Sequence, residues 1–98
     1  MELTDEELKQ VEEMSAALLP PNEIAILLKL DFSIRKLFCE VCKSHVQSPI
    51  YEAYQCGKLT TKLELRRTVV KLAKAGSPAA EPLAEKYIKE QIIGENVK

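Results

Sequence analysis

The sequence predicts an all-α fold, and three observations lead to that prediction. Apolar residues recur at helical spacing, as in Leu8, Val11, Met14 and Leu18. Helix-capping residues, prolines and glycines punctuate the chain at intervals that suit helices. No stretch alternates β-branched and polar residues as a sheet strand would. With 98 residues the chain has the usual size of one domain, so we expect a single small helical domain over residues 1–98.

The first helix begins with a capping box, in which Thr4 is the N-cap and Glu7 follows three residues later. Pro20 and Pro21 should end this helix, because proline cannot continue one. Pro21 also suits the first position of a second helix, since the missing N–H has no partner there in any case.

The second and third helices are expected to form a helix-turn-helix over about residues 21–45. Asp31 and Phe32 would make the turn, and Ser33 is a good N-cap for the third helix. The glycine that usually lies near such a turn is absent, and Lys29-Leu30-Asp31 occupies its place. The apolar residues expected on the inner sides of these two helices are Ile24, Ala25, Leu27, Leu28, Ile34, Leu37, Phe38 and Val41.

Three more helices are expected in the second half of the chain. A short one should run over residues 48–57 and stop at Gly57, and a longer one over 59–75 should be closed by Gly76. The last should start at Ser77-Pro78, with Pro82 delaying its regular part. Together, residues of about 59–93 would form a C-terminal helical hairpin.

Charge is distributed unevenly, although the formal net charge is only −1. Residues 1–30 carry a net charge of −5, residues 31–74 carry +5, and residues 75–98 carry −1. A basic middle segment favours an anionic partner, which the total charge conceals. The alternative is an ordinary solvated helix surface.

Composition narrows the class of protein. The chain is 46% hydrophobic and 30% charged, which is typical of a folded globular chain. No apolar run approaches the roughly 20 residues of a membrane span, and the acidic start does not read as a secretory signal. Three cysteines do not form a disulfide framework, so we expect a reducing, cytoplasmic setting and no membrane partner.

The basic residues of the third helix suggest contact with double-stranded DNA. Two adjacent cations, Arg35 and Lys36, lie in its first turn, where a helix-turn-helix reaches phosphates and base edges. Arg67, Lys71 and Lys74 line one edge of the long helix over 59–75 and could also face phosphates. The residues expected to contact DNA are Ser33, Arg35, Lys36, Lys43, Arg67 and Lys71. A purely structural helical hairpin is the alternative.

We predict neither a metal site nor catalysis nor a cofactor. On one continuous helix, Cys39 and His45 point about 120° apart, which is poor convergence for a tetrahedral zinc site that Cys42 and Cys56 would have to complete. The single histidine has no evident nucleophile system, and the three glycines form no phosphate loop. The chain is therefore expected not to be an enzyme.

Two features of the long fifth helix concern packing. Its apolar residues cover about half of its circumference, which indicates packing on two sides and hence a homo-oligomer through the last two helices. Arg66 projects into this apolar arc. We therefore expect Arg66 to be a structural residue whose charge pairs with a carboxylate of another helix, from Glu52, Glu81 or Glu85.

The order of these parts resembles the small terminase subunits of tailed bacteriophages and prophages, over about residues 20–90. The motifs that carry the resemblance are Glu23-Ile24-Ala25, Ser48-Pro49 followed by Tyr54 and Gly57, Glu64-Leu65-Arg66, and Ala73-Lys74-Ala75-Gly76-Ser77 with Ala79-Ala80. The resemblance implies recognition of viral DNA when packaging begins, a ring-like oligomer, and a large terminase ATPase subunit as partner. It implies no catalytic residue on this chain. The alternatives are a helix-turn-helix transcriptional regulator and a helical protein-interaction module whose basic middle binds an acidic partner.

Overall fold

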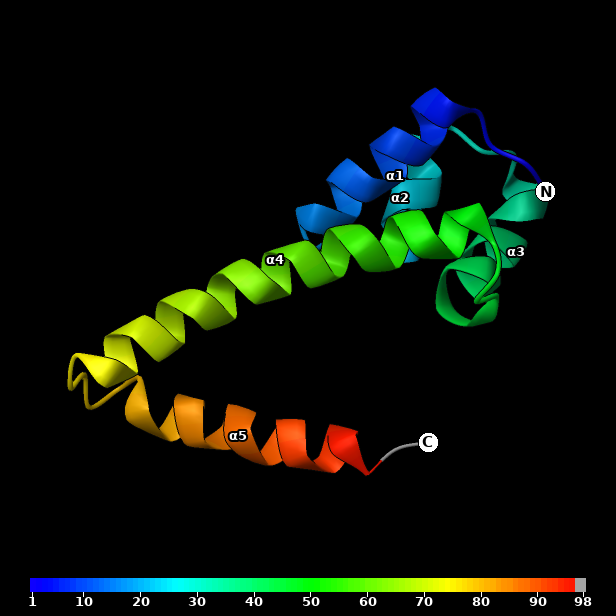
Figure 1. The fold of residues 1–98 in the computed structure, drawn as a ribbon. Coiled ribbons are helices and arrows are strands. Elements are labelled where there is room, and N and C mark those ends of the chain that lie inside the picture. Colours follow the sequence, from blue (N-terminus) through cyan, green and yellow to red (C-terminus); the bar gives the residue numbers. More distant parts are fainter. Residues whose placement is uncertain (97–98) are drawn as a thin grey trace. The chain divides into compact units, whose positions relative to one another are not determined.

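A computed structural model describes residues 1–96, which form five α-helices and no strand, so the all-α prediction is confirmed. Two compact units divide the chain: the first is Met1–Lys62 and the second begins at Leu63. The single domain expected from the length stays a prediction. Figure 1 shows the helices, which are α1 (Asp5–Ala16), α2 (Pro21–Leu27), α3 (Phe32–Ser44), α4 (Pro49–Lys74) and α5 (Glu81–Glu95).

Helix α1 begins as the sequence predicts. The backbone N–H of Glu7 donates to the Thr4 hydroxyl oxygen at 3.1 Å, and the Glu7 carboxylate accepts from the Thr4 N–H at 2.9 Å. This capping box satisfies two donors that the first turn would otherwise leave without a partner.

Three helices end in the same C-terminal motif, in which one residue adopts a left-handed conformation. After α2, the N–H of Leu30 donates to the Ala25 carbonyl and the N–H of Lys29 to the Ile26 carbonyl, which is the hydrogen-bond pattern of a Schellman motif. Gly76 fills this position after α4, as predicted, but non-glycine residues fill it after α1 and α2. The left-handed residues are Leu18 (φ 68°), Lys29 (φ 59°) and Gly76 (φ 90°).

The start of α3 differs from the prediction. The helix begins at Phe32, its N-cap is Asp31 without a side-chain capping bond, and Ser33 lies inside the first turn. The cause is the left-handed Lys29, which turns the chain sharply and buries Leu30. The chain therefore re-enters a helix two residues earlier than a cap at Ser33 would require.

The predicted break at Gly57 is wrong, because α4 runs without interruption from Pro49 to Lys74. Gly57 is buried where α4 meets α1. A Cβ atom built on it would lie 2.9 Å from the Ala16 backbone nitrogen and closer still to the Glu12 carbonyl oxygen. Gly57 therefore permits close approach of two helices instead of ending one.

Two hydroxyl groups flank this helix crossing. The buried Ser15 hydroxyl donates to the Tyr54 carbonyl of α4, and the Thr61 hydroxyl donates to the Ala16 carbonyl at the end of α1. Each bond uses a hydroxyl that would otherwise lose its water partner without compensation. The crossing of α1 and α4 is thus tied on both sides of Gly57.

The hydrophobic core belongs to the first unit, where α1, α2 and α3 gather around the first half of α4 (Figure 1). Each of these helices turns one apolar side inward, as the helical spacing of the sequence predicts, but the inward positions expected for Leu27 and Leu37 are wrong, because both side chains are exposed. The buried apolar residues of this core are Val11, Ile24, Ala25, Leu30, Phe38, Val41, Cys42, Ile50 and Ala53.

The second unit, by contrast, has almost no core. Ala80 is its one buried residue among those described, and α5 buries none. The expected helix start at Ser77 is wrong, because residues 77–80 form a turn and α5 begins at Glu81 with Pro82 in its first turn. Proline delays the regular helix, as expected. None of the helices described in residues 1–96 is long and apolar enough to cross a membrane.

Candidate nucleic-acid interface

The outward side of α3 carries two predicted DNA contacts that the fold presents to solvent together. Lys36 and Lys43 are seven residues apart and therefore only roughly 20° apart around the helix axis. Both are exposed, and the buried Phe38 and Val41 lie on the opposite side of the helix. Ser33 is exposed on the same outward side. Packing of α3 on the core thus fixes which residues a partner meets.

Arg35 has a more structural role than the sequence suggested. Its Nε donates to the Leu30 carbonyl at 3.0 Å, and its guanidinium lies 5.9 Å from the centre of the Phe32 ring. The side chain is half-buried. Arg35 therefore braces the turn between α2 and α3, although a guanidinium has four further N–H groups that an anion can accept from.

Phe32 is the most exposed large apolar residue of the described chain, with 86% of its surface accessible. It lies at the first position of α3, on the side that carries Lys36. Our sequence analysis placed Phe32 in the turn and overlooked it as a contact residue. The available signal was an aromatic residue one helical turn before two cations, because Arg35 and Lys36 lie three and four positions after Phe32.

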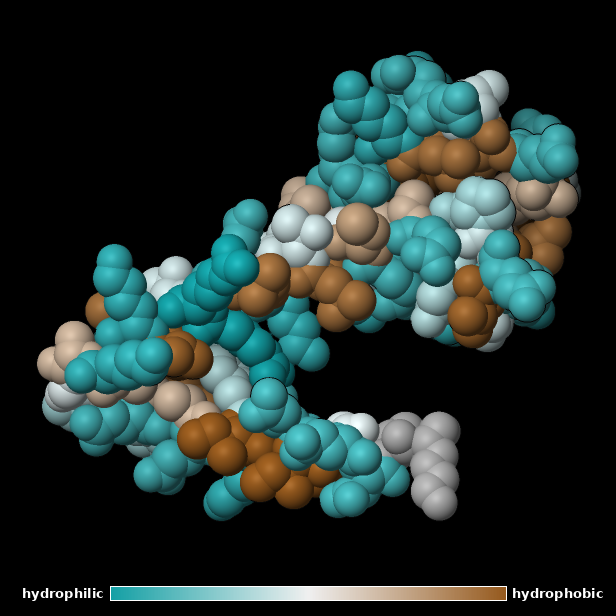
Figure 2. Space-filling model, in the orientation of Figure 1, coloured by the Kyte–Doolittle hydropathy of each residue, from teal (hydrophilic) through white to brown (hydrophobic). Residues whose placement is uncertain are grey.

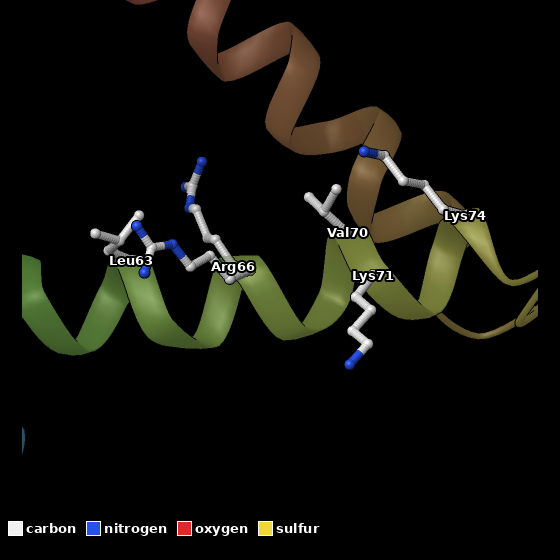
Figure 3. A pocket seen from close by; sticks show the side chains of 6 residues that line it. Leu63, Arg66, Val70, Lys71 and Lys74 are labelled. Atoms are coloured by element: carbon white, nitrogen blue, oxygen red, sulfur yellow. The ribbon is translucent and has the colours of Figure 1, made fainter.

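The other two predicted contacts, Arg67 and Lys71, lie on α4 in the second unit. They line a shallow groove of about 440 Å³, which Figure 3 shows together with the projecting side chains of Arg66 and Lys74. Lys74, which was expected on the same edge of the helix, also lines this groove. The groove residues, all from α4, are Leu63, Arg66, Arg67, Val70, Lys71 and Lys74. The six predicted contacts thus form two clusters, one in each unit.

Arg66 closes one edge of this groove. It forms a salt bridge with Glu90 of α5, and its guanidinium lies 4.1 Å from the centre of the Tyr87 ring. A carboxylate from another helix was expected, but the expected partners Glu52, Glu81 and Glu85 were wrong. The pair is also less buried than expected, with side chains 29% and 41% exposed.

The cysteines of the first unit do not converge on a common point. Across residues 1–96, no three His, Cys, Asp or Glu side chains gather as metal ligands. Burial raises the pKa of the Cys42 thiol to about 12, and the neighbouring Cys39 adds to the shift. Cys42 therefore remains a protonated, poorly nucleophilic thiol at neutral pH and acts as a core residue. Burial also raises the pKa of Tyr54 above its usual value.

Searches against protein-family models, curated proteins and solved structures find no match to this chain.

Proposed function

We propose that the chain is a non-catalytic DNA-binding protein in which α2 and α3 act as a helix-turn-helix. The outward side of α3 would face the major groove of double-stranded DNA, whose width admits one α-helix. The observation that supports this proposal is the position of Lys36 and Lys43, which are exposed directly opposite the core-facing Phe38.

Geometry favours a role for these lysines in phosphate binding. Seven helical residues separate them, which is about 10 Å along the axis, so they can neutralise two phosphates of the same groove. Such contacts orient a protein on the duplex without reading its sequence. Ser33, at the N-terminal end of α3, lies where helix-turn-helix proteins contact base edges.

The biological setting that we propose is packaging of viral DNA, with the chain acting as a terminase small subunit. The support is the order of sequence motifs over about residues 20–90. In this role the chain would mark the viral DNA, and a large terminase ATPase subunit would supply the chemistry. A helix-turn-helix transcriptional regulator would use the same α3 surface and differs only in what it recruits.

A helical protein-interaction module is the second candidate, and the exposed Phe32 favours it. An aromatic side chain 86% exposed beside a cation is a common anchor in protein interfaces. Such a module would present the same α3 surface to an acidic protein and would not bind duplex DNA.

The deciding experiment measures binding to duplex DNA across a range of salt concentrations. The double variant Lys36→Ala/Lys43→Ala should weaken binding and lower the slope of log K against log salt by up to about two. Glu40→Ala, on the same outward side, is the matched control and should leave the slope unchanged or strengthen binding. An unchanged slope in the lysine variant would remove α3 from the interface, and an absence of duplex binding would leave the protein-interaction module.

A further inference from the structure

The groove on α4 has the residue spacing of a helix–helix seam. Leu63, Arg67, Val70 and Lys74 follow one another at intervals of four, three and four residues, which keeps them on one side of the helix. Leu63 and Val70 supply the apolar positions, and both are exposed. Figure 3 shows Arg66, Val70 and Lys74 projecting from this side of α4. The seam is thus an apolar strip bordered by cations.

Helix α5 carries a seam with the same spacing and the opposite charge. Its members are separated by four, three, four and three residues, which places them on one side of the helix. Ile88 and Ile92 supply the apolar positions and are both more than half exposed. Figure 2 shows apolar surface on α5. The five exposed members of this seam are Glu81, Glu85, Ile88, Ile92 and Glu95.

These two seams complement each other in charge, in apolar content and in length. The α4 seam spans about 17 Å from Leu63 to Lys74, and the four members of the α5 seam from Glu85 to Glu95 span about 15 Å, so Glu81 would lie beyond the end of the groove. Within one chain, α5 contacts α4 through Arg66, Tyr87 and Glu90, and the five members of the α5 seam remain exposed. A helical hairpin that buries only Ala80 has too little core for its size and requires further contacts.

We propose that the acidic seam of α5 from a second copy of this chain docks into the cationic groove of α4. A two-fold pair of chains would fill both grooves at once, because each copy supplies one groove and one acidic seam. The result is a four-helix bundle made of two α4–α5 hairpins. Arg67 and Lys71 then contact glutamates of the second copy instead of DNA phosphates.

Charge reversal tests this pairing. In Arg67→Glu/Lys71→Glu/Lys74→Glu the groove and the α5 seam are both negative, because three glutamates outweigh Arg66, and in Glu85→Lys/Glu95→Lys both are positive. Each variant alone should be monomeric at micromolar concentration by light scattering, because like charges oppose each other across the seam. An equimolar mixture should recover the mass of the wild-type dimer, because each groove then meets a seam of opposite charge. Unchanged helicity of each variant by circular dichroism shows that the changes act on association.

Three outcomes would overturn the proposal. The first is a wild-type chain that remains monomeric at these concentrations. The second is a charge-reversal variant that keeps the wild-type mass by itself. The third is a mixture that stays monomeric although each variant folds. If Arg67→Glu/Lys71→Glu/Lys74→Glu weakens duplex binding and leaves the mass unchanged, the groove serves DNA. The slope measured with Lys36→Ala/Lys43→Ala does not depend on these results, so the two proposals fail separately.

Discussion

Both units of this chain are helical, but they differ in how many of their apolar side chains are buried. In Met1–Lys62, parts of four helices enclose a continuous core around Phe38, Ile24 and Val11, each fully buried. From Leu63 onward, two helices leave nearly all of their large apolar side chains exposed. The first unit therefore has a core that can stabilise it, whereas the described residues of the second unit bury too little apolar surface to form a comparable core.

The two units also differ in what surrounds their exposed cations. In the first unit, the core is complete, so the exposed residues of α3 are available to a partner without a cost in folding. In the second unit, exposed apolar residues lie between the charges, as they do in helix–helix interfaces. A surface lysine or arginine therefore supports a different proposal in each unit. On α3 it supports contact with DNA, and on α4 it supports contact with a second copy of the chain.

The largest expected change in the free energy of unfolding follows from a substitution in the core of the first unit. Phe38→Ala removes a fully buried ring and should lower the free energy of unfolding by about 3–5 kcal/mol. Ile93→Ala in α5 is the control, since Ile93 is 65% exposed and lies outside the proposed acidic seam; it should cost less than about 0.5 kcal/mol. Urea unfolding followed by circular dichroism measures both. Similar losses in the two variants would mean that the two units share one cooperative core.

Close packing of α1 on α4 gives the next effect. Gly57→Ala places a methyl group against the backbone of Glu12 and Ala16, which cannot rotate away as a side chain could. The helices must separate, at a cost of about 3 kcal/mol in unfolding free energy. Gly94→Ala is the matched control: its added methyl group meets no atom within 4 Å, so thermal unfolding should show no loss or a gain of up to about 1 kcal/mol. A well-tolerated Gly57→Ala would contradict the close approach of α1 and α4.

Gly57 also shows what sequence reasoning can and cannot reach. The helical class, the capping box at Thr4 and the ending at Gly76 follow from local rules, because each depends on residues within one turn. A glycine inside a helical pattern has two interpretations, a stop or a close approach. Only the position of α1, which is distant in sequence, decides between them.

The candidate site shows the same limit. Periodicity predicted that Lys36 and Lys43 lie outside the apolar side of α3, and the structure places them there. The partner of Arg66 could not be found in this way, because the expected start of the last helix at Ser77 was four residues too early. The partner is Glu90, which lies five residues beyond the expected Glu85. The bond from Arg35 to the Leu30 carbonyl depends on the turn geometry, which no local rule supplied.

A smaller effect is expected at the link between α4 and α5. Arg66→Ala removes the ion pair with Glu90 and the contact with the Tyr87 ring. Because the pair is partly exposed, water and salt screen it, so the loss should be about 1 kcal/mol in place of the roughly 3 kcal/mol of a buried pair. Arg66→Lys keeps the charge and should recover only part of it, because a lysine cannot stack flat on the ring. Urea unfolding at low and high salt measures the difference. A loss near 3 kcal/mol that does not depend on salt would show that the pair is buried in the folded state in solution.

The smallest effect is a gain in stability in the first unit, at the turn between α2 and α3. Lys29 adopts a left-handed conformation (φ 59°) and its side chain is exposed. That conformation brings the Cβ of an ordinary residue close to a carbonyl oxygen and costs about 1 kcal/mol, whereas glycine adopts it freely. Glycine also loses more backbone entropy on folding, so Lys29→Gly should stabilise the unit by a net amount of up to about 1 kcal/mol. Gly76→Ala makes the opposite change in the second unit. Because Gly76 has a φ of 90°, this substitution should lower the stability by a similar amount. Thermal unfolding of both variants measures the pair. If Lys29→Gly lowers stability, the turn has a different conformation in solution, and the orientation of Lys36 and Lys43 on α3 would no longer follow from it.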